Sequence, residues 1–445
     1  MSVAKRRIEP VSAFAELWDR HRDYLPGRGE VASWRAGKFA AFEQAGFPTA
    51  KVEQWKYTNV AKWANLAMGL APKEGVGTDE LSRWLAGGTQ ARRLIFINGH
   101  LISELCHVGG LPRGVVVMGL GRMLEQDPAR AAAALAEFDD DSGLAALNGA
   151  FATSGAWIEL ADGTALDEPL QLLFLTVGQS AAVMTNTRNL VRLGRGARLH
   201  LIESHVALGH GHCLTNMVTQ LRLGADADLT HDRLELGRDG TTLINRVAGT
   251  LGERSRLVKT TATLGGGLVR NDKELRLEGP KIEALLNGVY MPIGREHVDT
   301  QIRVHHLAPD CHSNQFYKGV VDGQSHAVFA GKIIVHKPAQ KTDAFQTNNN
   351  LLLSDDAEID TRPELEIYAD DVKCSHGATV GDLDPTALFY LRSRGMPLPA
   401  AKSLLIYGWA GEVIERMRDD SLRAQARKAV LRRLPGGAAL DGLEE

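Results

Sequence analysis

The chain has 445 residues, of which 44% are hydrophobic and 24% are charged, and this composition excludes an intrinsically disordered protein. Lysine and arginine together number 51 against 54 aspartates and glutamates, a formal net charge of −3, so the basic excess of a dedicated nucleic-acid-binding protein is absent. At roughly 150 residues per domain, the length predicts two or three units.

The sequence shows neither a targeting signal nor a membrane segment. Its basic start, MSVAKRR, is not followed by the apolar stretch of a signal peptide. No run approaches the roughly 18 apolar residues of a membrane helix. The four cysteines form no CxxC pair and are too few for a disulfide framework. We therefore expect a cytoplasmic protein with free thiols and no membrane partner.

The first ninety residues show apolar side chains at helical spacing. Phe14 and Leu17 are three residues apart, and Phe39 and Phe42 repeat that interval. Five of the seven tryptophans also lie before residue 91. These features predict an N-terminal helical region over residues 1–91 with a small core of its own.

From about residue 92 the apolar pattern changes to the period of two that is typical of strands. The segment RRLIFINGHLISEL carries Asn98-Gly99 between apolar runs, which predicts a hairpin with a type I′ turn. A short helix is predicted over residues 127–138, because Asp127 and Pro128 are a favourable N-cap and first-turn pair.

Beyond residue 155 the sequence is a succession of short strands with a recurring turn. Similar segments begin at Leu193, Leu223, Leu251 and Leu277, so the steps are 223−193=30, 251−223=28 and 277−251=26 residues. A loose repeat of this length indicates a solenoid. Apolar residues that alternate with polar neighbours indicate strands with one buried face. We therefore predict a mainly β fold with a β-solenoid core over residues 92–383.

The strand pattern ends near residue 383, and Asp384-Pro385 opens a C-terminal helical region over residues 384–445. Residues 416–433 carry seven basic side chains against two acidic ones, a local excess of five. This excess indicates either a solvated helix face or a docking surface for an acidic partner.

The motifs of independent catalysis are missing. The chain has no GxxxxGK[ST] phosphate loop, no HExxH, no GxSxG and no dinucleotide-binding GxGxxG. It is therefore predicted to have no ATP site of its own. All four cysteines instead have a histidine within two positions, and thiolate with imidazole is a ligand set that suits iron, copper or zinc.

Cys374 and His376 are the most favourable pair of ligands. Residues two positions apart on a strand project to the same face, so these two side chains could bind one ion. Two ligands fall short of the four that iron and zinc sites usually require. The others would come from elsewhere in the fold or from a second protein. The alternative is a buried thiol beside a surface imidazole, with no metal.

The C-terminal third also carries family signatures. Residues 314–417, which include CSHGATVG at 374–381, resemble the conserved end of the SufB/SufD family of scaffold proteins for iron–sulfur cluster assembly in the SUF system. Gly377 stands where B-type members carry a glutamate, which resembles the D-type branch. The segments GFPTAKVEQWKYTNV at 46–60 and LIFINGHL at 94–101 also resemble that branch. The resemblance covers roughly residues 30–420.

The resemblance implies a right-handed parallel β-helix between two helical regions, in a non-catalytic scaffold subunit that also assists iron acquisition. The implied partners are SufB, at the C-terminal end of the β-helix, and the ATPase SufC, at the C-terminal helical region. A homodimer is implied as a possibility for the isolated chain. His376 matches the family histidine that helps to build a transient iron–sulfur cluster at the interface with SufB, as a metal ligand. Cys374 matches the neighbouring cysteine of that motif.

Three other interpretations stay open. Parallel β-helices often belong to polysaccharide lyases, and Asp355-Asp356 and Asp370-Asp371 are acidic pairs that could serve as calcium ligands, although adjacent strand residues point apart. The chain could also be the B-type paralogue or a self-assembling scaffold. Finally, it could be a structural adaptor that holds the ATPase and SufB together without contributing a ligand to the cluster.

Overall fold

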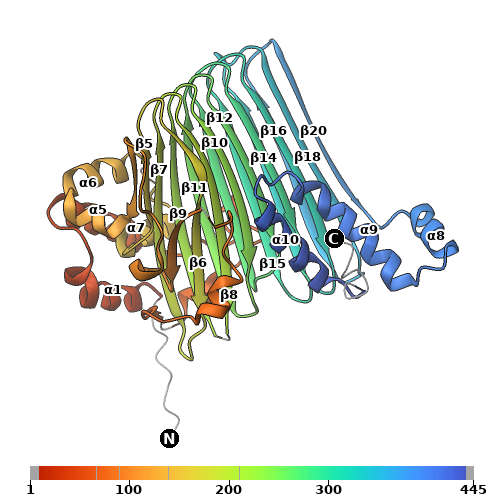
Figure 1. Cartoon of the computed structure of the whole chain (residues 1–445), viewed down its shortest axis with the longest axis horizontal. Coiled ribbons are helices and arrows are strands. Elements are labelled where there is room, and N and C mark those ends of the chain that lie inside the picture. Colours follow the sequence, from red (N-terminus) through yellow and green to blue (C-terminus); the bar gives the residue numbers. More distant parts are fainter. Residues whose placement is uncertain (1–9, 67, 90, 139, 210, 437–445) are drawn as a thin grey trace, which may run out of the picture.

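The computed structural model describes residues 10–436, except residues 67, 90, 139 and 210. Its main feature is a parallel β-solenoid of about seven turns over residues 157–381, with helices at its N-terminal and C-terminal ends (Figure 1). This arrangement confirms the β-solenoid core with helical ends that the sequence predicts.

Two ten-stranded sheets form the solenoid, and from β5 to β20 successive strands of the chain alternate between them. The first sheet contains β1 (Gly69–Leu70), β4 (Val115–Gly119), β5 (Ala156–Leu160), β7 (Val183–Leu193), β9 (Cys213–Leu223), β11 (Thr241–Leu251), β13 (Leu268–Leu277), β15 (His297–His306), β17 (His326–Val335) and β19 (Glu358–Ile367). The second sheet contains β2 (Arg92–Ile97), β3 (His100–Leu101), β6 (Ala165–Val177), β8 (Arg198–Leu208), β10 (Asp228–Leu236), β12 (Arg256–Thr263), β14 (Glu283–Tyr290), β16 (His312–Val321), β18 (Thr342–Leu352) and β20 (Val372–Gly381).

The recurring turn of the sequence repeat lies where the chain leaves the first sheet. Six successive turns each contain one residue in the left-handed region, with φ between 52° and 64°: Gly196, Asp226, Arg254, Lys281, Asp310 and Lys341. The backbone N–H of each donates to a carbonyl of the next coil, as Asp226 does to Glu253 at 2.8 Å. The turns are therefore stacked and hydrogen-bonded, which fixes the length of each coil.

The local predictions for residues 92–138 are confirmed. β2 and β3 form an antiparallel hairpin in which Asn98 and Gly99 have φ of 51° and 79°, as a type I′ turn requires. The predicted helix is α6 (Pro128–Ala136), and the Asp127 side chain accepts a hydrogen bond from the Arg130 backbone N–H. Inside the solenoid, the alternating leucines Leu199 and Leu201 are buried.

Most of the N-terminal helices cover one face of the first sheet and share its core, whereas Leu81 of α4 (Thr78–Ser82) packs against strands of the second sheet. The N-terminal half contains α1 (Pro10–His21), η1 (Arg22–Tyr24), α2 (Glu30–Ala45), η2 (Glu53–Trp55), α3 (Ala61–Ala64), α4, η3 (Ser103–Leu105), α5 (Leu120–Gln126) and α7 (Gly143–Phe151), besides α6. Phe14 and Phe42 pack in one cluster with Leu147 of α7 and Met184 of β7. The prediction of a separate small core is therefore wrong. The apolar side chains of these helices are buried further by packing on α7 and on the first sheet, which removes more of their surface from water.

The C-terminal region consists of α8 (Pro385–Ser393), α9 (Leu398–Ile414) and α10 (Asp420–Arg433). Helices α9 and α10 pack on the second sheet, and Lys318 of β16 anchors α9 through an ion pair with Glu412 at 2.7 Å. The Lys318 ammonium also lies 4.0 Å from the ring centroid of Trp409. Helix α8 has no buried residue and extends away from the solenoid (Figure 1). No helix in the described part of the chain is both long and apolar enough to cross a bilayer.

Candidate functional site

Cys374 and His376 lie on β20, which is the last strand of the second sheet. In the described structure β20 pairs only with β18, and β19 pairs only with β17. The last coil therefore presents one row of unpaired backbone N–H and C=O groups on each sheet. β20 is the outermost strand at this end of the solenoid (Figure 1). An exposed edge of this kind is a template for pairing with another chain.

The Cys374 side chain is half-buried at the end of the solenoid interior. It packs against a cluster that contains Ile333, Val335 and Ala344, and Ala344 is its register partner on β18. Burial raises the pKa of the Cys374 thiol, although a backbone hydrogen bond from Ala344 opposes the rise. The free sulfur is therefore protonated at neutral pH, and it becomes a ligand when a metal displaces the proton.

His376 is exposed, and it lies next to a column of buried amides. The strand register aligns it with Gln346 of β18, which is aligned in turn with Gln315 of β16. Both glutamines are buried, and their side-chain amide atoms have no hydrogen-bond partner among the described residues. Buried polar atoms without partners mark places that a water molecule or a ligand completes. The end of the solenoid is therefore polar beneath His376.

Cys374 and His376 lie two residues apart on β20, so their side chains project from the same face of the strand, as predicted from the sequence. Among the described residues, no third histidine, cysteine, aspartate or glutamate completes a ligand group with them. Their number therefore remains two, which is too few for a closed iron or zinc site within this chain.

The other three thiols belong to the packing of the fold. Cys213 and Cys311 are buried, and Cys106 is half-buried. Burial raises the pKa of all three thiols. The Cys311 Sγ atom also lies 3.2 Å from the Gly279 carbonyl oxygen, to which it donates. These surroundings suit structural thiols.

The acidic pairs considered for a lyase do not converge. Asp355 and Asp356 lie in the turn before β19, whereas Asp370 and Asp371 lie in the turn after it. The ten residues of β19 separate the two pairs. Nothing in this arrangement favours a calcium-dependent lyase site.

A buried ionic cluster inside the solenoid is the main feature that sequence reasoning missed. The Glu203 carboxylate accepts hydrogen bonds from Arg233 at 2.7 Å, His205 at 2.8 Å and His231 at 2.7 Å. Arg233 also donates to Glu235 at 2.6 Å. Burial alone would raise the pKa of Glu203, but Arg233 and the two histidines hold it well below its usual range.

The same cluster contains a buried lysine. Lys259 donates to Nδ1 of His231 at 2.9 Å, so a neutral His231 with its proton on Nε2 satisfies both of its contacts. Burial, together with Lys259, lowers the pKa of His231 to about 4. Burial also lowers the pKa of Lys259 well below its ordinary value. The sequence does contain a signal for this cluster, because Glu203 and Arg233 are 30 residues apart, which is the length of one coil, and they are register partners.

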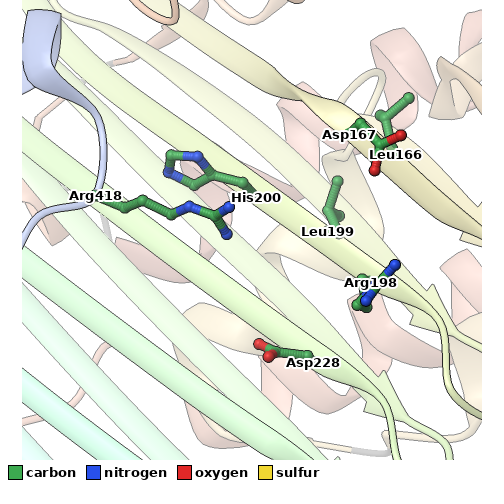
Figure 2. Close-up of a pocket in the computed structure, with 7 residues that line it drawn as sticks. All are labelled: Leu166, Asp167, Arg198, Leu199, His200, Asp228 and Arg418. Carbon is green, nitrogen blue, oxygen red and sulfur yellow. The ribbon is translucent and has the colours of Figure 1, made fainter.

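A cavity of about 390 Å³ lies on the second sheet, near the beginning of β8 and β10. Its lining is of mixed charge: Leu166, Asp167, Arg198, Leu199, His200, Asp228 and Arg418 (Figure 2). His200 is held by Asp232 at 2.9 Å, and this carboxylate also accepts the Arg418 backbone N–H. The lining contains no cysteine and no residue of β20, so the cavity is separate from Cys374 and His376.

Known protein families and individual proteins match this chain over almost its whole length. Residues 174–409 match the family model described as SUF system FeS cluster assembly, SufBD core domain, and residues 10–172 match the SufBD protein N-terminal region. The chain is 32% identical over 402 residues to the iron–sulfur cluster assembly protein SufD of Escherichia coli, covering 89% of this chain and 91% of that protein. It is 31% identical over 393 residues to a SufBD family protein of Synechocystis, covering 86% of each.

SufD of Bacillus subtilis is a more distant relative, 23% identical over 297 residues, which are 66% of this chain and 68% of that protein. The two family matches meet near residue 173, within β6, so they include both the helical start and the solenoid. The chain therefore belongs to the SufB/SufD family of the SUF system for iron–sulfur cluster assembly, and it is a SufD-like member.

Proposed function

We propose that this chain is the non-catalytic D-type scaffold subunit of a SUF complex, and that a nascent iron–sulfur cluster is built at its interface with SufB. The observation that carries the proposal is the open edge of the last coil, where Cys374 and His376 lie on the outermost strand. Two ligands on an unpaired edge suit a site that a second protein completes.

SufB would bind by continuing the two sheets. β19 and β20 are each ten residues long and have free backbone groups along one side, so a partner strand can add to them through main-chain hydrogen bonds. Apolar side chains are exposed at the same end of the solenoid, with Tyr368 at 61% and Val380 at 48%. Burying them adds a hydrophobic contribution to the interface.

The cluster would be shared between the two proteins. His376 would bind iron through its imidazole, and Cys374 would bind after metal displaces its thiol proton. A thiolate and a carboxylate from SufB would complete the set of four. Iron and sulfide are here the cargo of the complex. The unpaired amides of Gln315 and Gln346 would face this shared site and bind water or sulfide.

SufC would bind at the C-terminal helices. Phe389 and Tyr390 of α8 are 72% and 56% exposed, as large side chains in a partner contact would be before binding. Helices α9 and α10 are fixed to the second sheet, so a movement of SufC on α8 would be passed to the solenoid. ATP binding would close two SufC subunits and open the interface between this chain and SufB, a two-state change biased by nucleotide.

Without SufB, the same edge would pair with a second copy of this chain. An isologous dimer would place the two β20 strands side by side and would protect both edges. The isolated protein is therefore expected to form a homodimer, which SufB replaces with the complex of SufB and this chain.

The proposal is tested by co-expression with SufB and SufC. His376→Ala is compared with wild type by pull-down, and by visible absorption after anaerobic reconstitution with iron and sulfide. Ser375→Ala is the matched control, since its side chain alternates to the opposite face. An intact complex with reduced absorption only for His376→Ala would support a cluster ligand.

Two other outcomes would overturn parts of the proposal. Unchanged absorption in an intact His376→Ala complex would make this chain a structural adaptor, and the cluster chemistry would belong to SufB. Failure of that variant to assemble would give His376 a structural role at the interface. Repeating the comparison with Cys374→Ala shows whether the thiol is a second ligand.

A further inference from the structure

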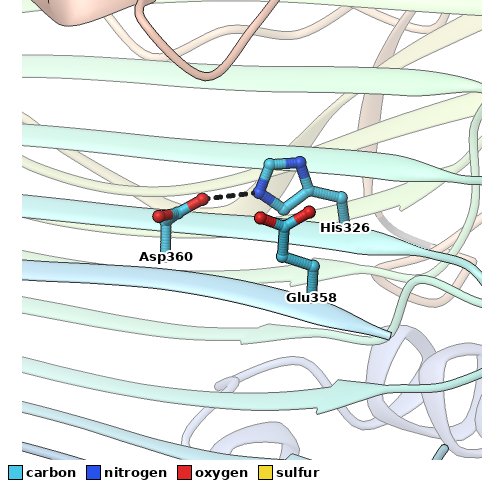
Figure 3. Close-up of side chains that lie close together, drawn as sticks. All are labelled: His326, Glu358 and Asp360. Atoms are coloured by element: carbon cyan, nitrogen blue, oxygen red, sulfur yellow. Dashed lines mark hydrogen bonds and ion pairs between the residues drawn. The ribbon is translucent and has the colours of Figure 1, made fainter. Parts of the chain in front are cut away.

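A histidine and two carboxylates converge on the outer face of the first sheet, at its C-terminal end. His326 begins β17 and is the register partner of Glu358, which begins β19; Asp360 follows two residues later on the same face. One ligand atom from each side chain lies within 4.8 Å of the others. Figure 3 shows a ring nitrogen of His326 directed toward Asp360, with the Glu358 carboxylate beside the imidazole.

The ligand atoms of His326 and Asp360 are already in contact. His326 Nε2 and Asp360 Oδ2 are 2.8 Å apart, the distance of a hydrogen bond. A metal ion that displaces the shared proton can bind both atoms. Imidazole and carboxylate are ligands that first-row divalent metal ions accept.

The charge around this group is uncompensated. Elsewhere on the first sheet, acidic side chains pair with cations, as Asp299 does with Arg270 and Glu366 with Lys332. Among the described residues, no lysine or arginine forms an ion pair with Glu358 or Asp360, and the only partner of Asp360 is His326. Two neighbouring carboxylates repel each other, and a bound cation relieves the repulsion.

The imidazole is held in place by its surroundings. The ring of His297 packs edge-on against His326 with centroids 4.8 Å apart. Nε2 of His297 in turn lies 2.9 Å from the Thr58 hydroxyl of the N-terminal segment. Side chains of His326 and Asp360 are 23% and 24% exposed, and Glu358 is exposed, so the group is open to water on the side of Glu358. A ligand fixed by its neighbours loses little freedom when it binds a metal.

We propose that His326, Glu358 and Asp360 form a binding site for one divalent metal ion of the Mn²⁺ or Fe²⁺ class. One imidazole with two carboxylates suits these ions, and water fills the remaining positions. The site lies on the first sheet, whereas Cys374 and His376 lie on the second. It stands independently of the proposed function and needs no partner chain.

Mn²⁺ binding to the purified full-length chain tests this inference. Free Mn²⁺ is measured by electron paramagnetic resonance during a titration, and Fe²⁺ competes under anaerobic conditions. Wild type is expected to bind one Mn²⁺ per chain. Asp360→Asn and His326→Gln should each weaken binding at least about tenfold. Glu366→Gln removes the same charge from the same strand and should leave the affinity unchanged.

The remaining comparisons separate this site from the one on β20. A Cys374→Ala/His376→Ala double variant should keep the Mn²⁺ affinity of wild type. Loss of binding in that variant would place the ion at β20 and overturn the inference. No saturable Mn²⁺ binding by wild type, or equal binding by Asp360→Asn, would overturn it as well. Circular dichroism of each variant confirms that it is folded, and Glu358→Gln replaces any variant that is not.

Discussion

Replacing Arg233 by methionine should destabilise the solenoid more than any surface substitution. The Arg233 guanidinium is fully buried and donates to Glu203 at 2.7 Å and to Glu235 at 2.6 Å. Methionine keeps much of the length and volume of the side chain but removes the charge. Two carboxylates, each 1% exposed, would then remain inside the solenoid without their cation.

The size of this destabilisation depends on which hydrogen bonds to the two carboxylates remain in the variant. Removing one partner of a buried ion pair costs about 3–5 kcal/mol. The cost is not doubled here, because the histidines still donate to Glu203, and Thr263 and Asn271 still donate to Glu235. For a unit of roughly 200 residues, each kcal/mol lowers the melting temperature by about 2–4 °C, so a decrease of about 6–20 °C is expected.

Thermal unfolding followed by circular dichroism measures this decrease. Arg276→Met is the control, because Arg276 forms an exposed ion pair with Glu278 that should contribute about 0–1 kcal/mol. A triple variant, Arg233→Met with Glu203→Gln and Glu235→Gln, removes all three charges and should regain part of the loss. A melting temperature for Arg233→Met within the range of Arg276→Met would refute the reasoning.

Two further predictions concern pH and the C-terminal helix. Burial, with Lys259 beside His231 and His312 beside His306, lowers the pKa of both His231 and His306 to about 4. The unfolded chain therefore takes up protons below pH 6.5 that the folded chain does not. The free energy of unfolding should fall between pH 6.5 and 4 by up to about 1.4 kcal/mol per pH unit for each histidine. Urea unfolding at several pH values measures this decrease, and a free energy of unfolding that does not change with pH would contradict it. A Phe389→Ser/Tyr390→Ser variant should keep its melting temperature within about 2 °C yet be retained at least about tenfold less by immobilised SufC. Equal retention would place the SufC contact elsewhere.

The period of the solenoid could be read from the sequence because a local rule produces it. Each of the six successive turns after the first sheet contains one residue in the left-handed region, and its N–H pairs with the next coil. Turn residues therefore recur at the length of a coil, and leucines alternate beside them. The hairpin at Asn98-Gly99 and the cap at Asp127 were predictable for the same reason, since their signals lie within a few residues.

The sharing of the N-terminal core was not predictable in this way. Helical spacing shows that Phe14 and Phe42 are buried, but it does not show against what. The structure packs them on α7 and on strands of the first sheet, more than a hundred residues away. Contacts of that sequence separation depend on how the whole chain closes, which local periodicity does not encode.

The sequence by itself determined that Cys374 and His376 share a face of a strand, because side chains alternate along every strand. Only the tertiary structure decided what surrounds them, an open edge beside the unpaired amides of Gln315 and Gln346. It likewise brought His326 and Glu358, which are 32 residues apart, into register. The physical reason is that parallel pairing joins residues one whole coil apart, and the length of each coil depends on the turns and sheets that close it.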